Sequence, residues 1–143
     1  MQHLAIMRKS WGLTRKILTG QKKIESRWYK NKYQPWNQIK VGEIVFFKDS
    51  GEAVTIKATV GKVIQFSDLT PLKVQEILEK YGLDDGIAKE DAPKYLGMFK
   101  DKKYCLLIYL ENPEKITPFQ IDKTGFGAMS AWITVKDIRD IRV

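Results

Sequence analysis

Hydrophobic residues recur with a period of two along most of the chain, which is typical of strands with one buried face. The strands predicted from this pattern are HLAIM (3–7), KKIESRW (22–28), KVGEIVFFKDS (40–50), AVTIKATVGKVIQF (53–66) and KYCLLIYLENPEKI (103–116). Three shorter β segments are predicted near the end of the chain: TPFQI (117–121), AWITV (131–135) and IRDIRV (138–143). Gly61 interrupts the fourth strand and predicts a bulge or corner there.

Two segments show the apolar spacing of a helix instead. One covers about residues 10–18, with Ser10 as a predicted N-cap and Gly20 at the position of a left-handed terminator. The other covers about residues 71–81, where Thr70 is a suitable N-cap and Pro71 suits the first helical position. A third, short helix is predicted at about residues 93–98, within a loop region.

Strands outnumber helices, and their order along the chain does not repeat a strand–helix–strand unit. No internal repeat and no Pro/Gly-rich linker divides the 143 residues. We therefore predict a single domain over residues 1–143. Its predicted fold class is α+β, a small mixed or mostly antiparallel β-barrel with short flanking helices.

The positive charge of the chain is concentrated near its start, and this indicates a possible function. The net charge is +8, but residues 1–40 alone sum to +9, which leaves −1 for residues 41–143. Aromatic residues are interleaved with these cations: Trp11, Trp28, Tyr29, Tyr33 and Trp36. Cations attract phosphates and aromatic faces stack on bases, so this mixture favours single-stranded nucleic acid as a partner. A lysine-rich solubilising surface is the alternative explanation.

Several classes of protein are disfavoured. No apolar run approaches the roughly 20 residues of a membrane span, so no membrane partner is expected and the predicted location is cytoplasmic. His3 and Cys105 are the only residues of their kinds, which argues against a histidine triad or a zinc site. We expect no metal and no cofactor, and we expect Cys105 in the core.

One motif is specific. The segment GQKKIESRW contains the pattern GxKxxExR, with Gly20, Lys22, Glu25 and Arg27 at its four defining positions. This pattern after a short helix, followed by KVGEIVFF, resembles the ASCH domain of the PUA-like superfamily. The resemblance implies a β-barrel with a cleft beside the first helix, lined by the charged residues of the motif and proposed to bind RNA. The residues expected to bind nucleic acid are Arg8, Lys9, Trp11, Lys22, Lys23, Glu25, Ser26, Arg27 and Trp28.

Strand alternation would direct these side chains to two sides. Lys23, Glu25 and Arg27 are expected on one side, and Ser26 and Trp28 on the other, with Lys22 at the junction with the helix. Arg27 suits a phosphate, and Glu25 can accept a hydrogen bond from a base amino group. Alternatively, Glu25 and Arg27 form an ion pair that only holds the barrel together.

The resemblance also allows an enzyme directed at nucleotides. One ASCH-like relative is an amidohydrolase of acetylated cytidine that uses the motif lysine, a threonine three residues later and a glutamate; a ribonuclease is also known. Lys22 matches the lysine, but Glu25 occupies the threonine position. Lys22 and Glu25 are therefore the catalytic candidates, with the Lys22 pKa lowered by Lys23 and Arg27.

Two further features have simpler explanations. A third class of function, docking of a protein partner on the helix at 71–81, is disfavoured because its apolar face suits core packing. The segment GFGAMS (125–130) half-matches a dinucleotide-binding loop, but it lacks the third glycine and precedes no helix. It is predicted to be a flexible turn beside Trp132.

Overall fold

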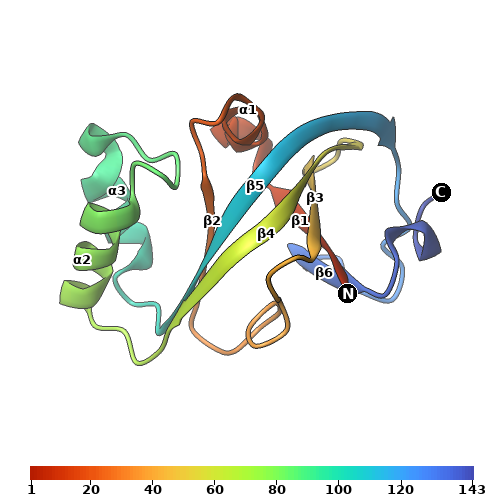
Figure 1. Ribbon diagram of the computed structural model, residues 1–143. Helices are drawn as coiled ribbons and strands as arrows, with labels where there is room; N and C mark the ends of the chain where they lie inside the picture. Colours follow the sequence, from red (N-terminus) through yellow and green to blue (C-terminus); the bar gives the residue numbers. More distant parts are fainter.

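The computed structural model describes all residues 1–143 and contains one curled, six-stranded sheet (Figure 1). Its strands are β1 (Gln2–Met7), β2 (Ile24–Tyr29), β3 (Ile44–Asp49), β4 (Val54–Phe66), β5 (Tyr104–Phe119) and β6 (Trp132–Val135). Their order across the sheet is β2-β5-β4-β3-β1-β6. Strands β1 and β3 are parallel and every other pair is antiparallel. The predicted α+β fold, a mixed and mostly antiparallel half-barrel, is confirmed.

Three α-helices accompany the sheet: α1 (Leu13–Thr19), α2 (Pro71–Tyr81) and α3 (Ala92–Phe99). Short 3-10 turns occur at η1 (Lys9–Trp11), η2 (Lys89–Asp91) and η3 (Ile138–Asp140). Figure 1 shows α2 and α3 together at one end of the molecule, while α1 lies beside the sheet. The helix predicted at 71–81 and the short helix near 93–98 are thus confirmed. No helix combines the length and the apolar character needed to cross a membrane.

The pattern misplaced some element ends. Ser10 does not cap α1, because it lies in η1, and α1 begins only after Gly12 adopts a φ of +62°. Residues 117–119 continue β5 and are not a separate strand. Residues 138–140 form η3, where the Asp137 side chain accepts a hydrogen bond from the Arg139 N–H at 2.9 Å. Only an isolated bridge between Ile121 and Arg142 has β pairing there.

The core occupies both faces of the sheet, which explains the alternation in the sequence. One cluster joins the sheet to α1: Ala5, Ile17, Val45, Phe47, Ile56, Leu106 and Ile108 are among its members. The opposite face of β2 and β5 packs against α2 through Ile24, Trp28, Val74, Ile77, Cys105 and Leu107. Cys105 is a core residue, as predicted. This second cluster fixes α2 and the loop after it beside β2.

The two glycine positions singled out in the sequence behave as predicted. Gly20 ends α1 in the left-handed region at a φ of +83°, and its N–H donates to the Ile17 carbonyl. The pairing of β4 with β5 shifts register between Val60 and Lys62, which is the predicted bulge at Gly61. The first of these turns directs the chain from α1 into β2.

Thr70 caps α2 and offers a direct test of this assignment. Its side-chain oxygen accepts a hydrogen bond from the Lys73 N–H at 3.2 Å. Replacing Thr70 with alanine is expected to lower the free energy of unfolding by about 1 kcal/mol, because that N–H loses its partner. Chemical denaturation measures the loss, and Thr70→Ser, which keeps a hydroxyl, is the control. Equal losses in both variants would contradict a capping role.

Candidate functional site

The strand that carries the GxKxxExR motif begins later in the sequence than the alternation of residues 22–28 predicts. Strand β2 begins at Ile24, not at residue 22, because Lys22 follows a bend at Gln21 and its N–H donates to the Lys16 carbonyl at 2.9 Å. The Lys22 side chain is therefore free of strand alternation. It turns toward Glu25, with 3.5 Å between Nζ and Oε1. The lysine and the acid of the motif consequently meet in one buried place.

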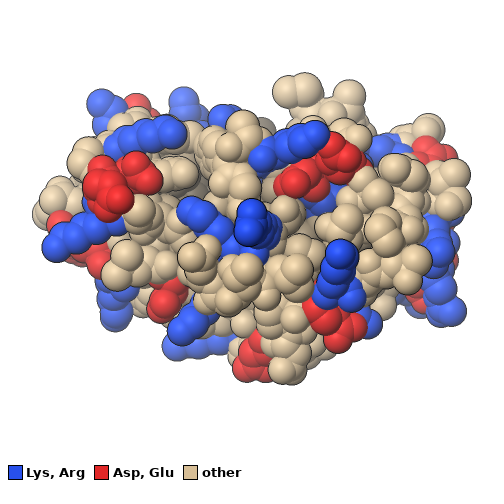
Figure 2. Space-filling view, turned by 90° about the horizontal axis from the view of Figure 1, so that it is seen from above, with Lys and Arg blue, Asp and Glu red and all other residues tan.

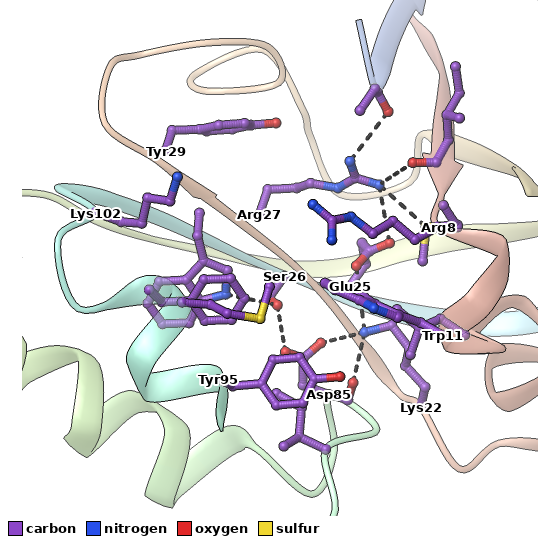
Figure 3. A pocket seen from close by; sticks show the side chains of 18 residues that line it. Arg8, Trp11, Lys22, Glu25, Ser26, Arg27, Tyr29, Asp85, Tyr95 and Lys102 are labelled. Carbon is purple, nitrogen blue, oxygen red and sulfur yellow. Dashed lines mark hydrogen bonds and ion pairs between the residues drawn. The ribbon is translucent and has the colours of Figure 1, made fainter. Parts of the chain in front are cut away.

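Asp85, in the loop after α2, completes this group (Figure 3). Lys22 Nζ donates to the Asp85 carboxylate and, at 2.8 Å, to the Asp85 backbone carbonyl. The Ser26 hydroxyl donates to the other carboxylate oxygen of Asp85 at 2.5 Å. The Lys22 ammonium thus makes two hydrogen bonds, both to Asp85, and an ion pair with Glu25. In this geometry the Lys22 ammonium is already paired with two carboxylates of the protein.

Backbone contacts hold the Asp85 loop against the start of β2. The Asp84 carbonyl accepts from the N–H groups of Lys23 and Ile24, at 2.6 and 2.9 Å. Gly86 adopts a φ of +80°, and a Cβ there would lie 3.1 Å from the Lys22 Cβ. A larger residue at position 86 would therefore be strained and would also press on Lys22. The loop positions Asp85 as firmly as the strand positions Glu25.

The three charged side chains are almost completely buried. Lys22 and Glu25 are each 3% exposed, and Asp85 is 5% exposed. Burial opposes the charge on Lys22, but the carboxylates of Asp85 and Glu25 outweigh it and raise the Lys22 pKa above its ordinary value. Burial also raises the pKa of Asp85, and Glu25 adds to this effect against the attraction of Lys22. The prediction of a lowered Lys22 pKa is wrong, because two acids adjoin the ammonium.

Arg27 bridges the open side of the curled sheet. Strands β2 and β6 are its two edges and do not pair with each other. The Arg27 guanidinium crosses between them and donates to the carbonyls of Ala131, at 3.3 Å, and Ile6, at 3.5 Å. It also lies 3.4 Å from Glu25 Oε2 and 5.2 Å from the Trp132 ring centre. The expected pair of Glu25 and Arg27 exists, and it joins β2 to β1 and to the residue before β6.

A pocket of about 480 Å³ opens above this buried group. Strand β2, the Asp85 loop, η1 and α3 contribute to its walls, as Figure 3 shows. Seven of the nine predicted binding residues line it: Arg8, Trp11, Lys22, Glu25, Ser26, Arg27 and Trp28. Because β2 is an edge strand, side chains from both of its faces reach the same cavity. The structure brings together residues that strict alternation would have separated.

The two aromatic residues of the motif region have different positions in this pocket. Trp28 is 8% exposed and stacks on Phe99, with ring centres 4.7 Å apart and planes 5° apart. Trp11 is half-buried; its ring meets Tyr95 edge-on at 5.7 Å, and the Arg8 guanidinium lies 4.7 Å from its ring centre. Trp28 is thus part of the core, whereas Trp11 presents a ring to the cavity.

Two predicted residues lie outside the pocket. Lys9 forms an ion pair with Glu52 on the surface. Lys23 is exposed beside the start of β2. Neither side chain lines the cavity. The basic character of residues 1–40 is also diluted in space, since Figure 2 shows acidic and basic side chains interspersed over the face seen there.

Sequence reasoning missed several residues of the pocket, including three with polar side chains. Asp85, Tyr95 and Lys102 all line it, and they come from the region predicted as loop and short helix. No local pattern in LDDG (83–86) distinguishes the second aspartate from the first. The only signal is Gly86, whose left-handed conformation makes a tight turn next to Asp85. The contact joins residues 63 positions apart, which a one-dimensional pattern does not show.

The fold of the chain is that of solved ASCH-domain structures, in agreement with the resemblance seen in the sequence. In particular, the chain is similar to ZmASCH from Zymomonas mobilis, with a TM-score of 0.67 and 13% identity over 94% of this chain and 87% of that one. A mutant of ZmASCH gives a TM-score of 0.70 with 13% identity, over 97% and 93% of the two chains.

The N-terminal domain of Staphylothermus marinus McrB is a more distant structural neighbour. Its TM-score is 0.51 with 15% identity, over 83% of this chain and 76% of that one. No protein-family model and no curated protein matches the sequence. At these identities the similarity shows a shared fold, so the activity has to be argued from the pocket.

Proposed function

We propose that the protein binds RNA or another single-stranded nucleic acid, with an unstacked nucleotide entering the pocket above Lys22, Glu25 and Asp85. The observation that carries this proposal is the meeting of free cations and aromatic rings in one cavity. Arg8 is exposed and Lys102 is half-buried, and both line the pocket. Neither side chain forms a hydrogen bond or ion pair within the protein, although the Arg8 guanidinium lies against the Trp11 ring. Trp11 and Tyr95 add two partly exposed rings. Phosphates pair with such cations and bases stack on such rings.

The buried group gives this pocket a polar floor without a large net charge. Lys22 and Arg27 balance Glu25 and Asp85, so phosphate attraction depends on Arg8 and Lys102 at the rim. Ser26 Oγ accepts from Trp28 Nε1 at 3.1 Å and donates to Asp85, so its orientation is fixed. Carboxylate oxygens at such a floor are suited to accept from the amino group of a base. In the proposed mode, phosphates are recognised at the rim and a base is recognised inside the pocket.

Loss of one rim cation is expected to weaken binding about equally for all nucleotide sequences, because phosphates carry no sequence information. In Arg8→Gln or Lys102→Gln, the slope of log affinity against log salt concentration is expected to fall by about 0.7 for each lost contact with a single strand. Isothermal titration with mixed-sequence RNA hexamers at four salt concentrations measures this slope. Lys115→Gln, an exposed site on β5 outside the pocket, is the matched control. Equal slopes in all four proteins would contradict the phosphate contacts.

Removal of the Trp11 ring is expected to weaken RNA binding by about 1–3 kcal/mol while leaving the salt slope unchanged, since stacking on a base involves no counterion. The same titration measures both quantities, and a melting curve checks that the variant remains folded. Trp11→Phe, which keeps an aromatic face, should retain most of the affinity. A salt slope that fell in Trp11→Ala would mean that Trp11 acts only by positioning Arg8.

The second candidate is a nucleotide-directed hydrolase at the same pocket, and one observation favours it. The Ser26 hydroxyl, the Asp85 carboxylate and the Lys22 ammonium form a hydrogen-bonded series, in which Asp85 is placed to take the hydroxyl proton. The raised pKa of Lys22 keeps its ammonium protonated, which does not suit the role of a base. Incubation with RNA and with an acetylated cytidine distinguishes the two functions. Turnover that Ser26→Ala abolishes, with binding intact, would replace the binding proposal.

A further inference from the structure

A second cavity, of about 700 Å³, lies next to the candidate pocket. Two loops form its walls. The loop between β2 and β3 contributes Tyr33 and Gln34, and the loop between β5 and β6 contributes Gly125, Phe126 and Met129. The second loop contains GFGAMS, the glycine-containing segment that has no part in the first pocket. The segment GFGAMS therefore lines a cavity beside the candidate pocket.

The two cavities share part of their walls. Tyr29 and Ala131 line both of them. Arg27 is at this boundary, because it lines the first cavity and its Nη1 donates to the Ala131 carbonyl at 3.3 Å. Trp132, which lies under the Arg27 guanidinium at 5.2 Å, lines the second cavity. The Arg27 guanidinium, whose hydrogen bonds within the protein are long, thus lies where the two cavities adjoin.

The second cavity presents exposed aromatic rings. Tyr33 is 59% exposed and Phe126 is 37% exposed. Tyr33 meets Tyr29 edge-on, with ring centres 5.8 Å apart, and the Tyr29 hydroxyl donates to the Gln34 carbonyl at 2.8 Å. The position of the inner ring is therefore fixed, while the outer rings are available. Exposed rings next to a cation are the usual platform for bases of a single strand.

Two glycines determine the backbone conformation of the loop on the other side of this cavity. Gly125 and Gly127 have φ values of +90° and +86°, and no atom lies within 4 Å of a Cβ built on either residue. This backbone conformation disfavours any other residue, so the two glycines set the turn that presents Phe126, which lies between them, to the cavity. The facing segment, residues 27–33, contains Arg27, Lys30 and Lys32 and no acid. Its charge matches a polyanion and not a basic or neutral partner.

We infer that the protein binds at least two consecutive nucleotides, with one base in the first pocket, the neighbouring base in the cavity of Tyr33 and Phe126, and the phosphate that links them beside Arg27. This inference rests on the proposed function and specifies its ligand, which is a short single strand and not a free nucleoside. The shared wall explains why the sites act together: a strand that fills both cavities passes the guanidinium between them.

The test is a length series. Isothermal titration is performed with unlabelled RNA of one, two, three and six nucleotides, each an equimolar mixture of the four bases, so that no base preference has to be assumed. The variants are Tyr33→Ala and Phe126→Ala, measured separately. The control is Leu72→Ala, which removes a side chain that is 65% exposed on α2, outside both cavities. Since all three side chains are at least partly exposed, melting curves are expected to be nearly unchanged.

The wild type is expected to bind dinucleotides roughly tenfold or more tightly than mononucleotides. Each of the two cavity variants should reduce that advantage several-fold while leaving mononucleotide affinity unchanged, and Leu72→Ala should change neither. Equal affinity for one and two nucleotides, or equal losses for both lengths in the variants, would overturn the inference and leave the proposed function standing. Absence of binding to every length would overturn both.

Discussion

Replacing Lys22 with methionine is expected to lower the free energy of unfolding by about 3–5 kcal/mol at neutral pH, because it leaves two buried carboxylates without their common partner. The Lys22 side chain is 3% exposed, and its ammonium contacts both Glu25 and Asp85. Methionine fills most of the volume of the lysine stem, so the loss measures the charge and not a cavity. Chemical denaturation gives the value. The matched control is Lys23→Met, at the exposed neighbour, which should change stability by less than about 0.5 kcal/mol.

The loss should also depend on pH in a defined direction. Asp85 has a raised pKa in the folded protein, so the folded state holds a proton on this carboxyl more readily than the unfolded state does. Such a group makes stability fall as the pH rises from the unfolded-state pKa, near 3.8, through the folded-state pKa. Removing Lys22 raises the Asp85 pKa further, so the deficit of Lys22→Met should shrink as the pH falls from 7. A deficit below about 1 kcal/mol at every pH would show that the pair contributes little.

Truncating Trp28 to alanine is expected to cost about 3–5 kcal/mol of stability, since it removes a large core ring. The ring stacks on Phe99 at 4.7 Å and belongs to the cluster that holds α2 against β2 and β5. Thermal or chemical denaturation measures the effect. Trp28→Phe keeps an aromatic face against Phe99 but loses part of the ring volume and the hydrogen bond from Nε1 to Ser26, so it should cost about 1–2 kcal/mol.

This result would separate the two tryptophans that the sequence treats alike. The sequence places Trp11 and Trp28 in one basic, aromatic region, and only burial distinguishes them. An unchanged melting temperature in Trp28→Ala, combined with a loss of RNA affinity like that in Trp11→Ala, would show that Trp28 serves a ligand. The expected outcome is the reverse, with Trp28 required for folding and Trp11 for binding.

Local signals account for the parts of the fold that were predicted well. Thr70 and Pro71 begin α2, Gly20 ends α1, and Gly61 marks the bulge between β4 and β5. Each is a property of one or two residues and their immediate neighbours. The end of the chain was predicted less well, because IRDIRV has an alternating pattern but the Asp137 side chain stabilises a 3-10 turn there. A local hydrogen bond outweighed hydrophobic periodicity.

The sequence predicted only part of the site, because the rest depends on contacts between residues far apart in the chain. The motif indicates that Lys22, Glu25 and Arg27 act together, and they do meet. It does not indicate their partners, because Asp85 and Ala131 reach them through the folding of distant loops. It also suggested free cations, whereas Lys22 and Arg27 are mostly engaged within the protein. The free cations Arg8 and Lys102 lie outside the motif.

The position of β1 has a consequence for how the chain folds. This strand precedes the other five in the sequence but lies between β3 and β6 in the sheet, so its partners are residues 44–49 and 132–135. At synthesis rates of roughly 5–20 residues per second, β6 follows β1 by about 6–25 s. Throughout that interval Leu4 and Ile6 belong to a sheet edge that lacks one neighbour. Contacts of such high sequence separation also place refolding in the range of milliseconds to seconds.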